Sequence, residues 1–363
     1  MLKWAGYLLY LSGITFILLE VILRFYNPFH FRLKGDKIVL ATNQKQTINN
    51  SINPRLDSLI TVSLNELGFR GDQKPAQFDS TLSIIAVGGS TTACSYLDDQ
   101  KTWPQQLGEK LDRQFRNIWI NNAGMDGHST FGHQVLLQDY LIKLKPRVIL
   151  FLIGVNDVGN EQPTSMEQVN DKNTSGNFKQ FLFEHSEVFN LALNLRRKWI
   201  AGKTLNTTQA FVDLRSLPEE PMTVAEIEKK LQSQQPYLNN YRKRVTALID
   251  TCLQYNIIPV MITQPSRSGV GIDSLTHVNL ETVKDLYGNG KCTWTILQRY
   301  NDEVRNICKE KGVFMIDLAN TMPKNSLYYY DQIHFTNEGA EKVASIVDTA
   351  LVQYLIEKFP SHR

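Results

Sequence analysis

The sequence predicts an α/β protein: a three-layer sandwich with a central, mostly parallel five-stranded sheet, preceded by one N-terminal transmembrane helix. Short apolar runs recur from Ser83 onward, and they alternate with stretches of helical periodicity. Strands that alternate with helices form parallel sheets that are covered on both faces. A long apolar segment at the N-terminus predicts the additional helix.

The elements of the sandwich follow from these patterns. Between the first two apolar runs, Trp103, Leu107 and Leu111 recur every four residues, which indicates a helix with one buried stripe. Similar patterns precede the third and fourth runs and fill residues 295–311 and 336–358. The apolar runs themselves have the length of short strands, and they lie at residues 84–87, 118–120, 148–153, 257–263 and 313–317.

The N-terminal segment has the properties of a membrane anchor. Residues 4–19 are uncharged and strongly apolar, and with residues 21–23 they make roughly 20 residues, about the length that crosses a bilayer core. Glu20 and Arg24 are one helical turn apart and can pair near the interface. We therefore predict a single-pass anchor at residues 1–26. A cleaved signal peptide is the alternative, but no small-x-small cleavage site follows the apolar run.

The rest of the chain divides into a lead-in and one large domain. Residues 27–80 are polar and irregular, and we expect a stalk or lead-in segment there. The α/β domain fills residues 81–363, with an insertion at about residues 158–235 that breaks the alternation of strands and helices. An insertion of this size is either a lid or acceptor platform over the functional edge, or a helical decoration of the core.

The composition excludes several partners. The 363 residues are 42% hydrophobic and 21% charged, and the net charge of +3 is scattered, so no nucleic acid partner is expected.

The cysteines lack CxxC and zinc spacing, and we expect no metal and no other cofactor. Their spacing favours none of the three possible disulfide connectivities, and unpaired buried thiols are expected. The four cysteines are Cys94, Cys252, Cys292 and Cys308.

The stretch AVGGSTTAC, residues 86–94, ends the first apolar run. Two glycines remove side chains from a strand-to-helix corner, so that Ser90 can stand exposed at the carboxyl edge of the sheet. This arrangement suits a serine nucleophile, and it equally suits an anion-binding loop or a plain tight turn. The carboxyl edge is also where open α/β sheets bind their ligands.

Three later blocks carry polar groups to the same edge. Asp331 and His334 are three residues apart in DQIH, a spacing that lets a carboxylate orient an imidazole as a general base. Gly127 in NNAGMDGHST and Asn156 in GVND can donate N–H groups to an oxyanion. Taken singly, each of these motifs is also explained by turn chemistry.

In their order along the chain, GGS, NAGMDG, GVND and DQIH resemble the SGNH/GDSL hydrolase family over about residues 83–350. The resemblance implies the flavodoxin-like SGNH hydrolase fold. It implies that Ser90 is the nucleophile, that His334 is the base and that Asp331 orients it. It also implies an oxyanion hole made of the Ser90 N–H, Gly127 and Asn156, with no metal. The stretches TWPQQL and NELGFRG resemble the family's first helix and the lead-in of its membrane-anchored members.

The chain departs from the family pattern at one position and leaves a choice at another. Gly89 stands where the family commonly has aspartate, which puts the rigidity of the loop in question. Gly124 competes with Gly127 for the oxyanion role, and alignment on the preceding Asn-Ala pair favours Gly127. His128 and His133 lack metal-ligand spacing, and we expect them to be edge residues near the substrate.

The predicted function is a serine ester hydrolase, an esterase or deacylase, that works through an acyl-enzyme on a small-molecule, glycan or lipid ester. An acetylated carbohydrate is one such substrate. An SGNH-type O-acyltransferase acting on a cell-surface glycan is the near alternative, and a non-catalytic, surface-anchored binding module is the alternative of another class. The resemblance implies an extracytoplasmic catalytic domain, whereas the positive-inside rule favours the cytoplasm because basic residues follow the span: Arg24, Arg32, Lys34 and Lys37.

Overall fold

The computed structural model describes residues 2–26, 33–34, 37–51, 53–163, 167, 182, 185–204, 209 and 211–363. The chain forms two compact units. The smaller comprises Met1–Ala41 and Ser165–Thr207, and the larger comprises Thr42–Thr164 and Thr208–Arg363. The larger unit contains the sheet. Part of the predicted insertion, including residues 168–181, lies outside the described residues.

The predicted parallel sheet is present in the larger unit, and each apolar run forms one of its parallel strands. Across the sheet the order is β12-β9-β8-β6-β7-β5. The first of the parallel strands in the chain lies between the second and the third, which is the order of doubly wound, flavodoxin-like folds. The parallel strands are β6 (Leu82–Gly88), β7 (Ile118–Asn122), β8 (Val148–Ile153), β9 (Ile258–Thr263) and β12 (Met315–Ile316).

A sixth strand extends this sheet at one edge. β5 (Arg70–Gly71) runs antiparallel to β7, with Arg70 opposite Asn122. The prediction of five strands misses it, because two residues carry no alternating apolar pattern. It follows a hairpin of β3 (Gln44–Asn49) and β4 (Leu59–Leu64), so the chain before residue 80 contributes to the edge of the larger unit.

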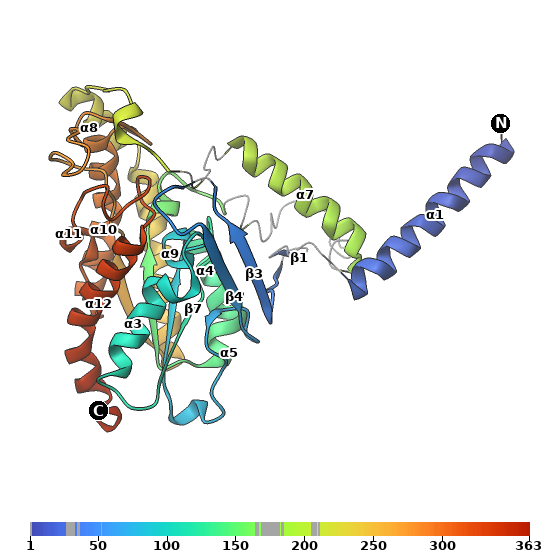
Figure 1. The fold of residues 1–363 in the computed structure, drawn as a ribbon, viewed down its shortest axis with the longest axis horizontal. Coiled ribbons are helices and arrows are strands. Elements are labelled where there is room, and N and C mark those ends of the chain that lie inside the picture. Colours follow the sequence, from blue (N-terminus) through green and yellow to red (C-terminus); the bar gives the residue numbers. More distant parts are fainter. Residues whose placement is uncertain are drawn as a thin grey trace. The chain divides into compact units, whose positions relative to one another are not determined.

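Helices cover the sheet on both faces, as Figure 1 shows. On one face α3 and α12 lie against each other, and on the other α9 packs between α4 and α10. The helices that form these two layers are α3 (Trp103–Asp112), α4 (Thr130–Leu136), α9 (Gln235–Gln254), α10 (Gly290–Lys311) and α12 (Asn337–Lys358). A π-helical turn at Leu137–Leu141 joins α4 to α5 (Ile142–Leu144). The other elements of this unit are α2 (Ser90–Ala93), α8 (Val224–Gln232), β10 (Lys284–Asp285), β11 (Gly288–Asn289) and α11 (Leu318–Thr321).

The core has two layers because strand side chains alternate between the faces. Ile84 and Leu150 are fully buried and belong to one cluster with Leu107 of α3 and Val347 of α12. The next residue of the first strand, Ile85, is equally buried and points by this alternation to the opposite face. The sheet is therefore buried on both sides, which explains why its strands appear in the sequence as continuous apolar runs.

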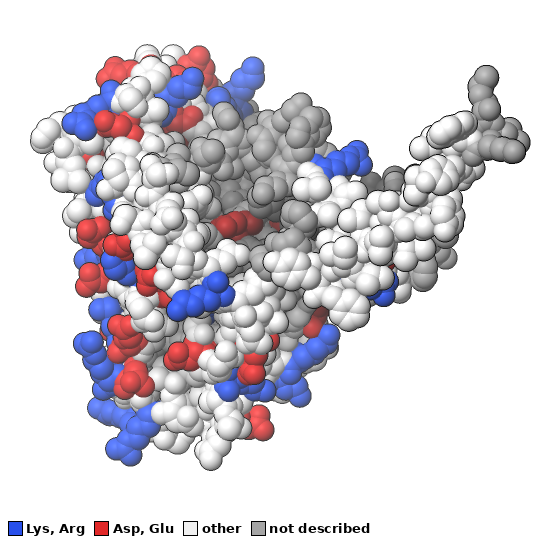
Figure 2. Space-filling view, turned by 45° about the vertical axis from the view of Figure 1, so that its right-hand side comes forward, with Lys and Arg blue, Asp and Glu red and all other residues white. Residues whose placement is uncertain are grey.

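The smaller unit contains the predicted N-terminal helix. α1 (Leu2–Phe25) includes the stretch Gly6–Phe25, which is long and apolar enough to cross a membrane. In Figure 2 the surface of α1 is white over most of its length, because it carries few charged side chains. The unit also contains α7 (Glu187–Thr204) and a short hairpin of β1 (Leu33–Lys34) and β2 (Lys37–Ile38).

All four cysteines are buried and free. Burial raises the pKa of the Cys94, Cys252 and Cys308 thiols to about 12, so these side chains stay protonated and unreactive at neutral pH. The prediction of unpaired, buried thiols is confirmed.

Candidate active site

Ser90 lies at the carboxyl end of β6, as the first residue of the one-turn helix α2. A Cβ on Gly88 would collide with the Thr92 side chain and the Leu152 carbonyl, so glycine is needed where the strand turns into the helix. Ser90 is only 7% exposed, and its hydroxyl lies against the His334 ring. The expectation of an exposed serine is therefore wrong, although its place at the edge of the sheet is as predicted.

Ser90, His334 and Asp331 form one hydrogen-bonded array. The Nε2 atom of His334 lies 2.7 Å from Ser90 Oγ, and its Nδ1 atom lies 2.6 Å from Asp331 Oδ2. The other carboxylate oxygen of Asp331 accepts hydrogen bonds from the backbone N–H groups of Ile333 and His334, each at 2.8 Å. The Thr336 hydroxyl caps α12 by accepting a hydrogen bond from Gly339 N at 3.1 Å, and so fixes the end of this turn.

The array shifts the pKa of both ionisable members. Burial alone would raise the pKa of Asp331, but the positive charge of His334 and three hydrogen bonds outweigh burial and lower it. Burial alone would lower the pKa of His334, but the charge and the hydrogen bond of Asp331 outweigh burial and raise it. Asp331 is therefore ionised at neutral pH, and His334 is a stronger base than a free imidazole.

Residues that the sequence did not single out cover the histidine. The Tyr330 ring stacks on His334 with centroids 5.6 Å apart and planes inclined by 10°. The Tyr330 hydroxyl donates to Gln209 Oε1, and Gln209 Nε2 donates to Asp126, which also accepts from Ser95. Tyr330 directly precedes Asp331 in YYYDQIH, so its position in the motif was an available signal. The contacts of Gln209 and Asp126 are long-range and leave no such signal.

The block after β8 brings an amide next to Ser90. A Cβ on Gly89 would collide with Asn156 Nδ2, so the two residues are in close contact. The same amide donates one hydrogen bond to the His128 carbonyl at 2.8 Å. The amide carries a second N–H, which remains available to a ligand beside Ser90.

The block after β7 contains both candidate glycines. Gly127 has φ of +72°, a left-handed conformation that favours glycine, and it directly precedes His128 beside Gly89. Gly124 instead uses its N–H in a 2.9 Å hydrogen bond to Asn122 Oδ1. A Cβ on Gly124 would collide with the backbone of Ala93, so this glycine permits close packing against α2.

A buried network ties these two blocks together. Asp157 accepts hydrogen bonds from the backbone N–H of Thr130, at 3.2 Å, and from the Thr130 hydroxyl. Arg244 on α9 donates from Nε to Thr130 Oγ1 at 2.7 Å and pairs with Asp157 at 3.3 Å. Its guanidinium lies 4.1 Å from the centre of the Phe131 ring. Asp157 follows Asn156 directly, so the network fixes the amide relative to the Gly127 loop.

The block after β9 supports the turn that holds His334. The Ser266 hydroxyl and the Arg267 N–H both donate to the Gln332 carbonyl, at 3.0 and 2.8 Å. Gln332 lies between Asp331 and His334 in the chain. The polar residues at the carboxyl end of β9 therefore hold the turn that carries Asp331 and His334.

His128 and His133 are not edge residues, because each is only 2% exposed. Burial lowers the pKa of His133 to about 3, so its ring is neutral. His128 lies where the Gly127 loop enters α4, and His133 lies within that helix. Within the described residues, no group of three or more His, Cys, Asp or Glu side chains is arranged to hold a metal ion.

A serine hydroxyl bonded to a carboxylate-oriented imidazole, beside clustered N–H donors, is an arrangement suited to acyl transfer. The fold and this site define the class of the protein: an α/β ester-bond hydrolase. Residues 86–342 match the model of the GDSL-like lipase/acylhydrolase family. The chain belongs to this family, which confirms the resemblance found in its sequence.

Solved structures give a more distant likeness. A lipolytic protein of the G-D-S-L family from Desulfitobacterium hafniense DCB-2 is 11% identical, with a TM-score of 0.41, and 75% of this chain covers 100% of that one. An acetyl xylan esterase, AlAXEase, is 15% identical, with a TM-score of 0.42 and coverage of 74% and 99%. The acetylxylan esterase Axe2 from Geobacillus stearothermophilus is 12% identical, with a TM-score of 0.41 and coverage of 75% and 92%. None of the curated proteins matches the chain.

Proposed function

We propose that the chain is a serine esterase or deacylase that works through an acyl-enzyme formed on Ser90. The 2.7 Å contact between Ser90 Oγ and His334 Nε2 carries this proposal, because it puts the base within reach of the proton that it removes. Asp331 holds His334 in the tautomer with the proton on Nδ1 and stabilises the imidazolium that forms. His334 then protonates the leaving alcohol, and water attacks the acyl-enzyme by the reverse sequence.

The oxyanion of each tetrahedral intermediate is bound by the backbone N–H groups of Ser90 and Gly127 and by the Asn156 amide. Two observations support this assignment. Asn156 Nδ2 packs against Gly89, next to Ser90, and keeps one N–H after bonding to His128. Gly127 has a left-handed backbone, with φ of +72°, and directly precedes His128, whose carbonyl accepts from the same amide. Such donors lower the barrier most when they are fixed before the reaction begins.

The substrate in this proposal is an acyl ester of a glycan or a lipid at a membrane surface. The apolar helix α1 supports it, because an N-terminal anchor at residues 1–26 would keep the hydrolase domain, residues 81–363, beside such esters. Residues 27–80 would then be the lead-in. The domain lies outside the cytoplasm in this proposal, on the ground of the family resemblance.

A second candidate is an O-acyltransferase that passes the acyl group to a sugar hydroxyl. The low exposure of Ser90 and His334 favours it, since a site closed to water protects an acyl-enzyme from hydrolysis. Product analysis with and without a sugar acceptor separates the two reactions. A binding module of this fold would give neither product.

Labelling with a fluorophosphonate probe tests the proposal. The detergent-solubilised full chain should react, and Ser90→Ala and His334→Ala should abolish the reaction. Ser216→Ala and His362→Ala are matched controls on the surface and should label as the wild type does. Hydrolysis of acetyl and longer acyl esters then identifies the acyl group. A folded wild type that neither labels nor turns over any ester would contradict the proposal.

A further inference from the structure

The helix that begins with Ser90 is too short to hold itself in place. α2 has a single turn, and it ends at Cys94, whose φ of +50° is left-handed. The last carbonyl groups of a helix lack partners within it, and in a one-turn helix this applies to nearly every carbonyl. The position of the Ser90 side chain therefore depends on what binds the carbonyl groups of residues 91–94.

Three side chains from three different elements bind those carbonyl groups. Trp103 Nε1 donates to the Thr91 carbonyl at 3.1 Å, and Asn122 Nδ2 donates to the Thr92 carbonyl at 2.7 Å. Arg70 Nη1 donates to the carbonyl groups of Ala93 and Cys94, at 2.8 and 2.9 Å. Arg70 thus holds the end of α2 with two bonds, whereas Trp103 and Asn122 contribute one each.

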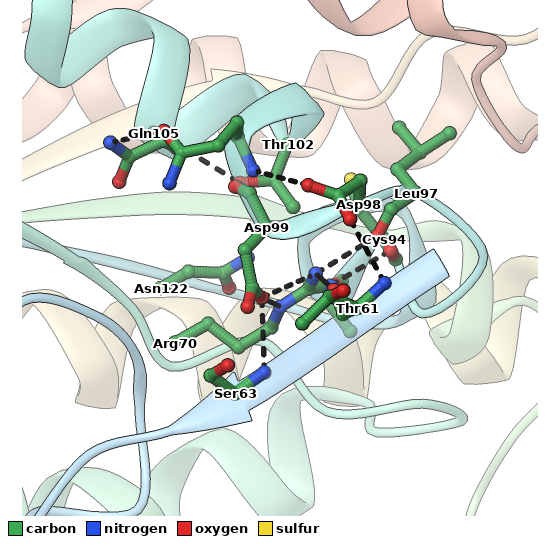
Figure 3. A network of polar contacts seen from close by, with 12 residues as sticks. Thr61, Ser63, Arg70, Cys94, Leu97, Asp98, Asp99, Thr102, Gln105 and Asn122 are labelled. Atoms are coloured by element: carbon green, nitrogen blue, oxygen red, sulfur yellow. Dashed lines mark hydrogen bonds and ion pairs between the residues drawn. The ribbon is translucent and has the colours of Figure 1, made fainter. Parts of the chain in front are cut away.

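The Arg70 guanidinium is itself fixed on all sides, as Figure 3 shows. It is 7% exposed, donates to the Leu97 carbonyl from Nη2 at 2.9 Å, and donates to Asp99 Oδ1 from Nε at 2.9 Å. Asp99 also accepts from the Ser63 N–H of β4 at 3.1 Å. The fork of a guanidinium suits such a set of fixed acceptors, whereas a lysine ammonium could satisfy only part of it.

Arg70 reaches this position from the segment before the α/β domain. It lies on β5, opposite Asn122 on β7, so two of the residues that bind α2 are neighbours across the edge of the sheet. The lead-in therefore supplies part of the support for the serine helix. A positive group at the carboxyl end of a helix is also electrostatically favourable.

We infer that Arg70 is a positioning residue for Ser90: it fixes the far end of α2 and so holds the Ser90 hydroxyl in line with His334 and the oxyanion donors. This inference rests on the proposed function of Ser90 as the nucleophile. Reacting groups that shift by about 1 Å lose on the order of 100-fold in rate. Loss of Arg70 therefore acts on the chemical step, and much less on substrate binding.

The first experiment compares Arg70→Met with Arg305→Met in the full chain. Arg305 also donates to an aspartate and is partly buried, but its bonds go to Asp302, Asp317 and Gln298. In Arg70→Met we expect kcat to fall about 10- to 100-fold, with KM within about threefold of the wild type, and fluorophosphonate labelling to slow in parallel. Arg305→Met should retain kcat even where it lowers Tm.

Two further measurements separate positioning from general stability. Arg70→Lys keeps the charge without the fork, and it should recover only part of the loss. A cavity of about 180 Å³ adjoins Arg70, so guanidinium ions at millimolar concentration should raise kcat of Arg70→Ala, whereas tetramethylammonium at equal ionic strength should not. If Arg70→Met fails to fold, the lysine variant gives the same test, and Asp99→Asn is its control, because it leaves the carbonyl bonds of Arg70 intact and should lose less kcat than Arg70→Lys.

The outcomes distinguish this inference from the proposed function. Wild-type kcat in folded Arg70→Met, or a change confined to KM, overturns the positioning role while Ser90→Ala still abolishes labelling. Full labelling of Ser90→Ala instead overturns the proposed function itself. Equal rescue by tetramethylammonium also counts against the inference, because it indicates a salt effect rather than a restored hydrogen-bond donor.

Discussion

Gly89 and Asn156 are packed so closely that a Cβ on the glycine would collide with the amide nitrogen of the asparagine. In this chain the contact leaves no room for a side chain at position 89. The backbone at Gly89 is extended, with φ of −79°, so the need is for space and not for an unusual conformation. The absence of a side chain lets the Asn156 amide pack against Gly89, the residue before Ser90.

Gly89→Ala should therefore damage the oxyanion hole without breaking the fold. The added methyl group displaces the Asn156 amide, and a lost oxyanion donor costs about 100- to 1,000-fold in kcat. We expect kcat to fall about 10-fold or more in Gly89→Ala, and about 100- to 1,000-fold in Asn156→Ala. Steady-state kinetics on one ester would measure both.

Gly108→Ala is the matched control, because a Cβ there meets Ile120 at an ordinary 3.6 Å. It should keep wild-type kcat. Equal kcat in Gly89→Ala and the wild type would show that Asn156 does not bind the oxyanion from its present position.

The pH dependence of activity should follow His334. Because the charge and hydrogen bond of Asp331 outweigh burial and raise the pKa of His334 above 6.5, the neutral base becomes the major form at a higher pH than in a free imidazole. The acid limb of kcat/KM, which reports the free enzyme, should lie above pH 6.5. Asp331→Asn removes the charge and should move the limb to lower pH while lowering the plateau. A wild-type limb below pH 6 would be incompatible with this account.

The same pair predicts opposite trends in stability. The raised pKa of His334 contributes stability that is present below pH 6.5 and is lost as the pH rises through the folded value. The lowered pKa of Asp331 contributes stability that is present above pH 3.8 and is lost as the pH falls through its folded value. Thermal unfolding of the wild type and His334→Gln across pH 6 to 9 would test the first trend, since only the wild type should lose stability from this source.

The sequence predicted the parts of the site that are encoded by local pattern. Ser90, Gly127 and Asn156 lie within a few residues of the ends of apolar runs, and the DQIH block lies further beyond the fifth run. The carboxyl ends of parallel strands meet at one edge. Asp331 is recognisable because its partner is three residues away. These relationships need no knowledge of distant contacts.

The supporting residues could not be predicted in the same way. Arg70 lies in a two-residue strand without apolar periodicity, and its acceptors on α2 lie more than 20 residues further along the chain. Arg244 meets Asp157 across 87 residues, and nothing in its helical neighbours marks it as different from a surface arginine. The burial of His128 likewise depends on packing around α4 and not on the motif that contains it.

Arg244 should affect kcat through the buried network that fixes the Asn156 amide relative to the Gly127 loop. Arg244→Met removes the bond to Thr130 and breaks the ion pair with the buried carboxylate of Asp157. Breaking one side of a buried ion pair costs about 3–5 kcal/mol, so we expect a lower Tm together with a fall in kcat. Arg242→Met is the control on the same helix, because its partners Glu303 and Glu310 are on α10. A fall in Tm with unchanged kcat at low temperature would restrict Arg244 to a structural role.

In the smaller unit, Glu20 of α1 acts as the cap of α7. Its carboxylate accepts from the Glu187 and Val188 N–H groups, at 3.0 and 3.2 Å, and from the Ser186 hydroxyl at 2.8 Å. Loss of a cap costs about 0.5–2 kcal/mol. Glu20→Ala should therefore speed hydrogen exchange at the first amides of α7 by about 2- to 30-fold, measured on the full chain in detergent. Glu66→Ala removes an exposed carboxylate in the larger unit and should leave the exchange rates of these amides unchanged. Unchanged exchange rates in Glu20→Ala would instead show that other contacts hold the start of α7.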